Sequence, residues 1–159
     1  MRTLVVAAGM VAVAGAAHAQ TPQQPSEVLL GLGEYCWEAQ LPDVVTDTHC
    51  FSVARGGHLV MDVHKVRARS GGVVYEGVTL YRMEEATGAV RFDYYNSGGQ
   101  LVSGYARREG SRVVFSDKAG GAPTTVWSVG PDAYEAGTGN AKAAKQRFAK
   151  VGQALEGGF

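Results

Sequence analysis

Two histidines and two carboxylic acids carry the chemistry that this chain is best equipped to perform. They are His49, Asp62, His64 and Glu76. Imidazole and carboxylate groups together bind Zn²⁺ or non-haem iron, and one imidazole that faces an open cavity can bind haem. The chain has none of the H-E-x-x-H, H-x-H or C-x-x-C patterns that accompany many such sites. We therefore expect no catalytic residue, no cofactor and no metal; the sequence favours a protein that is not an enzyme but does not decide the question.

The chain has two cysteines, Cys36 and Cys50. They follow a segment with the features of a secretion signal, and two cysteines of a small domain usually pair in the oxidising compartments that exported proteins reach. Redox catalysis is not indicated, because no C-x-x-C spacing is present. We predict a structural disulfide between Cys36 and Cys50, and two independent reduced cysteines are the alternative.

The N-terminal residues have the pattern of a cleavable signal peptide. Arg2 gives a positive start, residues 4–17 are small or apolar, and Ala17-His18-Ala19 is an A-x-A cleavage site. The apolar run is too short and too rich in Ala and Gly for a membrane span. We expect a protein of the periplasm or the cell exterior with no membrane span. The expected divisions are a signal peptide at 1–19, a disordered leader at 20–25, one barrel domain at 26–152 and a flexible tail at 153–159.

Charge and length limit the possible functions. The 15 basic and 15 acidic residues balance, and the basic residues form no continuous stripe. Nucleic-acid binding therefore has no electrostatic support. The chain that remains after removal of a signal peptide suits one hydrophobic core.

From Tyr35 onward, apolar residues recur with a period of two, which is typical of strands. Tight-turn residues separate the runs. The expected strands are 35–41, 46–53, 58–66, 73–83, 89–96, 100–108, 112–116, 124–129 and 132–136. A short helical turn over residues 28–30, capped by Ser26, precedes them. The pattern predicts an all-β fold, an antiparallel up-and-down barrel of about 8–10 strands.

The last segment admits two interpretations. Residues 140–155 contain good helix formers, and Phe148 and Val151 fall on one face of a possible helix. Residues 146–151 can instead form a strand that pairs with the first strand and closes the sheet, which removes two exposed edges. We favour the strand.

The predicted disulfide sets the faces of the first hairpin. Opposed residues of an antiparallel pair have a constant index sum, so pairing Cys36 with Cys50 places Trp37 opposite His49. The cysteines then face outward, and four residues face inward: Trp37, Leu41, His49 and Phe51. A slip of one residue would exchange the two faces.

Extending these pairings predicts a polar wall inside the barrel. A two-residue second turn places His49 opposite Asp62, and a third turn centred on Ser70 places His64 opposite Glu76. The same registers direct further residues inward: Val78, Leu80, Val90, Phe92 and Tyr94.

The candidate ligand-contacting residues are those that the registers direct into a cavity: Trp37, His49, Phe51, Asp62, His64, Glu76, Phe92 and Tyr94. Buried charges must be paired, so we expect imidazole–carboxylate contacts among the polar members. A purely structural polar network is the main alternative to a ligand-recognition patch, and a metal or haem site is a third interpretation.

Four motifs occur in order along the chain: Cys36-Trp37-Glu38, Thr48-His49-Cys50-Phe51, Gly56-Gly57 and Tyr75-Glu76-Gly77-Val78-Thr79-Leu80-Tyr81. In this order they resemble the calycin or lipocalin-like group of small exported bacterial barrels, over about residues 30–152. The resemblance implies an up-and-down barrel with a central cavity that commonly binds a small apolar molecule. It implies no catalytic residue.

Three functional hypotheses follow. The first is a binding protein for a small, partly apolar ligand held in the barrel cavity. The second is an envelope interaction or structural protein with a solid core. The third is an enzyme, haem carrier or metal-binding protein that uses His49, Asp62, His64 and Glu76. The mixed aromatic and polar inner face favours the first.

Overall fold

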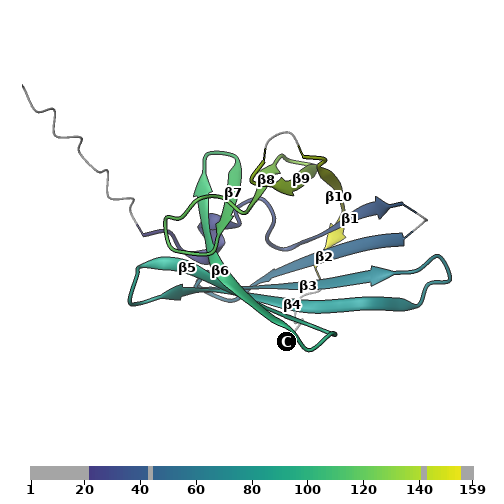
Figure 1. The fold of residues 1–159 in the computed structure, drawn as a ribbon, viewed down its shortest axis with the longest axis horizontal. Coiled ribbons are helices and arrows are strands. Elements are labelled where there is room, and N and C mark those ends of the chain that lie inside the picture. Colours follow the sequence, from purple (N-terminus) through teal and green to yellow (C-terminus); the bar gives the residue numbers. More distant parts are fainter. Residues whose placement is uncertain (1–21, 43–44, 141–142, 155–159) are drawn as a thin grey trace, which may run out of the picture.

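A computed structural model describes residues 22–42, 45–140 and 143–154. The ten strands within these ranges form one closed antiparallel barrel, in which each strand pairs with its sequence neighbours (Figure 1). The strands are β1 (Tyr35–Leu41), β2 (Val45–Val53), β3 (Leu59–Arg67), β4 (Val73–Glu84), β5 (Ala89–Asn96), β6 (Leu101–Glu109), β7 (Arg112–Ser116), β8 (Thr125–Val129), β9 (Ala133–Thr138) and β10 (Gln146–Gln153). The predicted all-β, up-and-down barrel is confirmed.

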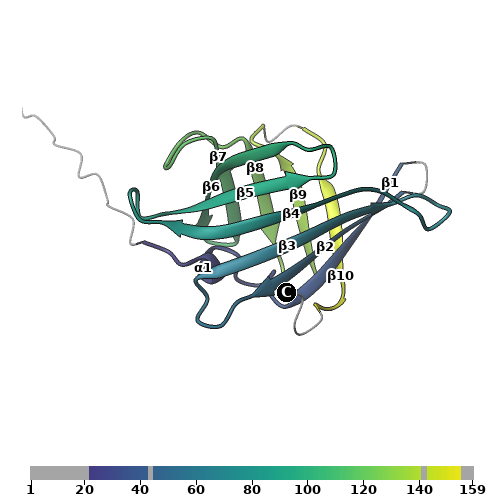
Figure 2. The same cartoon turned by 90° about the horizontal axis from the view of Figure 1, so that it is seen from below.

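The last strand closes the barrel. β10 pairs with β9 on one side and with β1 on the other, so the first and last strands lie side by side (Figure 2). The strand interpretation of residues 146–151 is therefore confirmed, and the helical interpretation is wrong. Within the described residues, no helix has the length and apolarity that a membrane span requires.

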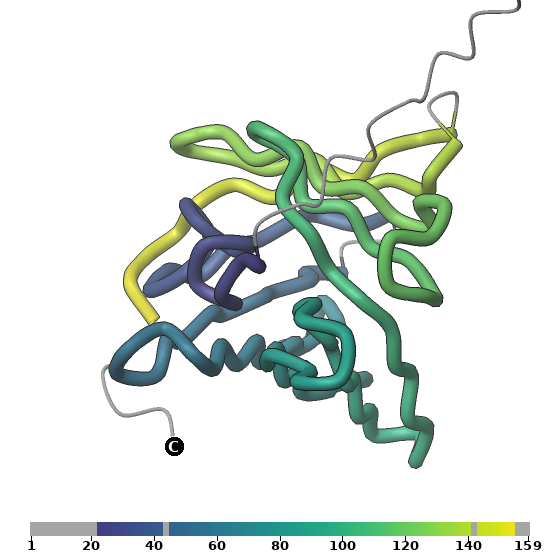
Figure 3. The backbone as a smooth tube through the Cα atoms, turned by 90° about the vertical axis from the view of Figure 1, so that its left-hand side faces the viewer, coloured from purple at the N-terminus to yellow at the C-terminus, as the bar shows by residue number. Residues whose placement is uncertain are grey.

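A short helix, α1 (Pro25–Val28), covers one end of the barrel and contacts β3, β4 and β6. Figure 3 looks at this end and shows the first described residues, in purple, within the outline of the strands. Val28, Leu29 and Leu32 are buried there. The indole Nε1–H of Trp37 donates to the Leu32 carbonyl at 3.1 Å, which satisfies a polar group that burial would otherwise penalise.

The helix begins earlier than predicted. Gln24 is its N-cap, and the Gln24 backbone N–H donates to Glu27 Oε2 at 2.8 Å. The predicted cap, Ser26, instead donates its backbone N–H to the Gly57 carbonyl at 3.2 Å. Pro at the first helical position suits this start, because its fixed φ is helical and it has no N–H to satisfy.

Contacts of the barrel extend beyond its predicted boundaries. The Arg108 backbone N–H donates to Gln23 Oε1 at 2.9 Å, and the Arg108 guanidinium donates to the Leu30 carbonyl at 2.5 Å. At the other terminus, the Ala154 N–H donates to the Glu34 carbonyl at 2.9 Å. Gln23 of the predicted leader and Ala154 of the predicted tail thus make hydrogen bonds to residues of the predicted domain. The predicted signal peptide, residues 20–21 and residues 155–159 lie outside the described residues.

The first hairpin has the predicted register. Cys36 and Cys50 are directly opposed and form a disulfide, and Trp37 pairs with His49. Trp37 and Phe51 are fully buried. The disulfide therefore lies on the outer face of the barrel wall, as predicted.

The second hairpin keeps its predicted faces but has a different register. His49 pairs with His64 rather than with Asp62, because the turn contains two more residues than predicted. Gly56 and Gly57 in this turn both have positive φ, which residues with a Cβ rarely adopt. A shift of two positions leaves every side chain on its original face.

The third hairpin reverses the predicted faces of β4. Arg67 pairs with Val73, as a turn centred on Ser70 requires, but a β-bulge follows and His64 pairs with Gly77. A bulge adds one residue to one strand and exchanges the faces beyond it. The predictions for three residues are therefore wrong, since these lie on the outer face: Glu76, Val78 and Leu80. The residues of β4 that face inward are Tyr75, Gly77, Thr79 and Tyr81.

Candidate ligand-binding cavity

The half of the barrel away from α1 contains a cavity of about 490 Å³. Three of its lining residues are exposed to solvent: Val102, of which 49% is accessible, Asp117 and Thr124. Residues of β2 to β8 and of the β7–β8 connection form the lining: His49, Asp62, His64, Tyr75, Thr79, Tyr81, Phe92, Tyr94, Val102, Ser103, Phe115, Asp117, Thr124, Thr125 and Trp127. The volume lies within the range of pockets that hold small molecules.

One side of the cavity is aromatic. The ring centroids of Phe115 and Trp127 are 4.6 Å apart, and the Phe92 ring meets Phe115 edge-on at 5.7 Å. Phe92 of β5 is directly opposite Gly104 of β6. A Cβ atom added at Gly104 would be 2.7 Å from the Phe92 ring. The absence of a side chain at Gly104 thus leaves the space that Phe92 occupies, and an apolar surface results.

The opposite side is polar and is built by β2 and β3. Asp47 and His49 are two residues apart on β2 and share its inner face, and His64 of β3 is directly opposite His49. The two imidazole rings stack at 4.3 Å with an angle of 11° between their planes. His64 Nε2 donates to Asp47 Oδ1 at 2.7 Å, and His49 Nε2 is 3.7 Å from the same oxygen.

Each imidazole has a second partner through its other nitrogen. His49 Nδ1 donates to Oδ2 of the buried Asp62 at 2.8 Å. His64 Nδ1 is 3.0 Å from the Tyr94 hydroxyl, which donates to the Tyr75 hydroxyl at 2.9 Å. These contacts join side chains of β2, β3, β4 and β5 and hold both imidazole rings in place.

Burial and charge oppose each other at His49. Desolvation lowers the pKa of His49, but the charge and hydrogen bond of Asp62 and the charge of Asp47 outweigh it, so the pKa is raised above 6.5. Burial and then the Asp62 charge also raise the pKa of Tyr81. Among the described residues, Asp62 Oδ1 has no hydrogen-bond partner. The wall therefore concentrates negative charge in a poorly solvated place.

The structure brings together five of the eight predicted cavity residues. The residues that line the cavity are His49, Asp62, His64, Phe92 and Tyr94. Trp37 and Phe51 face inward as predicted but belong to the closed-end core, where both are fully buried. Glu76 is exposed on the outer face, opposite Lys65, so its predicted place inside the barrel is wrong.

The predicted list of cavity residues left out Asp47 and four aromatic cavity residues: Tyr75, Tyr81, Phe115 and Trp127. Asp47 was detectable, because the first hairpin places it opposite Ala39 on the same face as His49. Tyr75 and Tyr81 share a face that was assigned to the exterior. A signal for the reverse assignment exists, since the charged residues Glu76, Arg82 and Glu84 all lie on the other face of β4.

No protein-family model matches the chain. No curated protein is significantly similar to it in sequence either. The cavity must therefore be interpreted from its own geometry.

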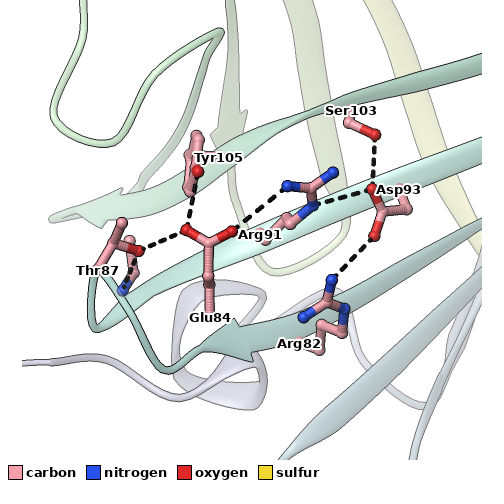
Figure 4. Close-up of polar contacts among 8 residues, drawn as sticks. Arg82, Glu84, Thr87, Arg91, Asp93, Ser103 and Tyr105 are labelled. Carbon is pink, nitrogen blue, oxygen red and sulfur yellow. Dashed lines mark hydrogen bonds and ion pairs between the residues drawn. The ribbon is translucent and has the colours of Figure 1, made fainter.

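A network of charged residues holds the outer face of the wall formed by β4, β5 and β6 (Figure 4). Arg91 donates to Asp93 at 3.0 Å and to Glu84 at 3.3 Å, and Ser103 donates to Asp93 at 2.6 Å. Burial raises the pKa of Asp93, but the hydrogen bonds from Ser103 and Arg91 and the charges of Arg91 and Arg82 outweigh it and lower the pKa below its ordinary value. The network links three strands whose inner faces line the cavity.

Proposed function

We propose that the protein is an exported binding protein with a calycin-like barrel, which holds a small, partly apolar ligand in its cavity. The observation that carries this proposal is a cavity of about 490 Å³ with an aromatic side at Phe92, Phe115 and Trp127 and a polar side at His64 and Tyr94. A ligand with one apolar and one polar end would satisfy both sides.

Two features support export. The predicted signal peptide at residues 1–19 would direct the chain out of the cytoplasm. The disulfide between Cys36 and Cys50 is stable in the oxidising compartments that exported proteins reach.

The alternative of a structural protein required a barrel with a solid core. Trp37, Phe51 and Tyr134 belong to a buried core, but this core does not fill the barrel, because Tyr81 and Phe115 of the same core also line the cavity. The cavity supports the binding proposal over the structural one.

The two tryptophans of the chain give a test with an internal control. Trp127 lines the cavity, whereas Trp37 lies in the closed-end core. We expect N-phenyl-1-naphthylamine, an apolar probe without charge, to bind with quenching of Trp127 fluorescence, because the described cavity lining contains Asp62 and no Lys or Arg. The quenching should be weaker in Trp127→Phe, because the remaining Trp37 does not line the cavity. Native mass spectrometry of the purified protein should also detect a retained small molecule.

A pair of matched substitutions locates the binding. Val102→Phe adds bulk at an exposed residue of the cavity lining, whereas Val74→Phe adds the same bulk at an exposed residue outside the lining. We expect Val102→Phe to weaken probe binding about tenfold or more, since it removes space that the probe fills, and Val74→Phe to leave it unchanged. The proposal would be refuted if Val102→Phe left probe binding unchanged and native mass spectrometry detected no retained small molecule.

A further inference from the structure

We propose that Asp47, His49 and His64 form a binding site for a divalent transition-metal ion on the polar wall of the cavity. The inference does not depend on the organic ligand proposed above. It differs from the four-residue cluster expected from the sequence, because Asp47 takes the place of Glu76 and Asp62 has a supporting role.

The ligand atoms are already gathered. One ligand atom each from Asp47, His49 and His64 lies within 4.8 Å of the other two. His64 Nε2 and His49 Nε2 are 2.7 Å and 3.7 Å from Asp47 Oδ1. Ligands at Zn²⁺ bond lengths of 2.0–2.2 Å and near-tetrahedral or octahedral angles lie about 3.0–3.4 Å apart. Shifts of a few tenths of an ångström would suffice on the Asp47 side, and the two stacked rings would tilt toward each other.

The fold explains why these three residues meet. Asp47 and His49 are alternate residues of β2, so both face inward, and His64 is the directly opposed residue of β3. The ligands therefore project from two paired strands in the middle of the sheet. A site on such strands is held more firmly than one on a loop.

The outer partners match those of metal-binding histidines. Such histidines usually donate their second ring N–H to a carboxylate, carbonyl or water, which fixes the ring and its tautomer. His49 donates Nδ1–H to the buried Asp62 carboxylate, and His64 Nδ1 contacts the Tyr94 hydroxyl. In both rings the nitrogen directed at Asp47 is Nε2, so the metal-facing atoms and the supporting atoms are distinct.

Charge supports the same assignment. Asp47 and Asp62 place two carboxylates on this wall, and their ion-pair partners among the described residues are His49 and His64. None of the described cavity-lining residues is Lys or Arg. A divalent cation would balance the two carboxylates without any further basic group. Oxygen and imidazole nitrogen ligands are the set that Zn²⁺, Fe²⁺ and the neighbouring metals prefer.

Zn²⁺ and Co²⁺ titrations of protein freed of metal by a chelator test the proposal. We expect saturable one-to-one binding of Zn²⁺ by calorimetry, and a visible Co²⁺ absorption band of a nitrogen- and oxygen-ligated site. Asp47→Asn and His64→Ala should each weaken binding by more than the roughly 10–100-fold that loss of an outer partner costs. Asp62→Asn should fall within that range.

The third described histidine supplies the matched control. His58 is exposed in the turn between β2 and β3, remote from the cavity, so His58→Ala should bind Zn²⁺ as the wild type does. Circular dichroism and melting curves establish that each variant is folded; Asp47→Asn retains the shape of the side chain if His64→Ala is destabilised. Absence of saturable Zn²⁺ binding by the wild type, or binding unaffected by Asp47→Asn, would overturn the proposal. The titrations contain no organic ligand, so this proposal and the proposed function can fail separately.

Discussion

Removal of the disulfide between Cys36 and Cys50 should lower the free energy of unfolding by about 3 kcal/mol and leave ligand binding in the cavity unchanged. The two cysteines are 14 positions apart, so the bond closes a loop of 15 residues in the unfolded chain. Loop-closure entropy for this length corresponds to about 3 kcal/mol at 25 °C. For a domain of this size, such a change lowers the melting temperature by roughly 10 °C.

The folded barrel should survive this change. β1 remains paired with β2 over six residue pairs and with β10 on its other edge, and both sulfur atoms lie on the outer face, away from His49. The double variant Cys36→Ala/Cys50→Ala should therefore bind the fluorescent probe like the wild type. Wild-type protein in reductant should match the double variant in stability.

Urea unfolding, followed by Trp fluorescence and circular dichroism, measures the difference in free energy. A loss of less than about 1 kcal/mol would refute the reasoning, because the unfolded chain would then gain little freedom from removal of the bond. Loss of probe binding by the double variant at unchanged stability would refute the claim that the disulfide on the outer face does not affect the cavity.

Two further predictions concern the wall formed by β4, β5 and β6. Gly104→Ala should destabilise the protein by about 1–3 kcal/mol, because its Cβ would overlap the Phe92 ring and the core would be overpacked; Gly152→Ala, which meets open space, should be close to neutral in the same urea titrations. Arg91→Met should reduce stability at pH 6 more than at pH 3. The pKa of Asp93 is lowered in the folded state, partly by Arg91. The ionised Asp93 carboxylate therefore stabilises the fold above the unfolded pKa of about 3.9, and this contribution is lost as the pH falls through the folded pKa. Equal costs of Arg91→Met at both pH values would contradict this assignment.

The sequence was sufficient for the strands and for the first register. Period-two patterns located the strands, and the cysteine pair fixed which residues of β1 and β2 face inward. The bulge between β3 and β4 was not predictable in this way, because one extra residue leaves the turn at Ser70 unchanged and reverses the faces of the rest of β4. The error moved Glu76 into the expected site and removed Tyr75 from it.

The sequence also could not show how far along the barrel axis each inward side chain lies. Trp37 and His49 face inward with equal clarity in the strand pattern, yet one is sealed in the closed-end core and the other lines the cavity. The difference depends on Val28, Leu29 and Leu32, which lie outside the strands and belong to the same buried core as Trp37. Strand periodicity carries no information about that packing.

The pairing of β1 with β10 has a consequence for the order of folding. Tyr35 pairs with Gln153, so the last pair of strands to form joins residues from opposite ends of the domain's sequence. β1 can find β2 as soon as that hairpin exists, but its second edge stays bare until the end of the chain arrives, and long-range pairing of this kind is slow. During that interval the exposed edge is open to strands of other molecules. Early formation of the Cys36–Cys50 bond would leave β1 half-protected while it waits for its last partner.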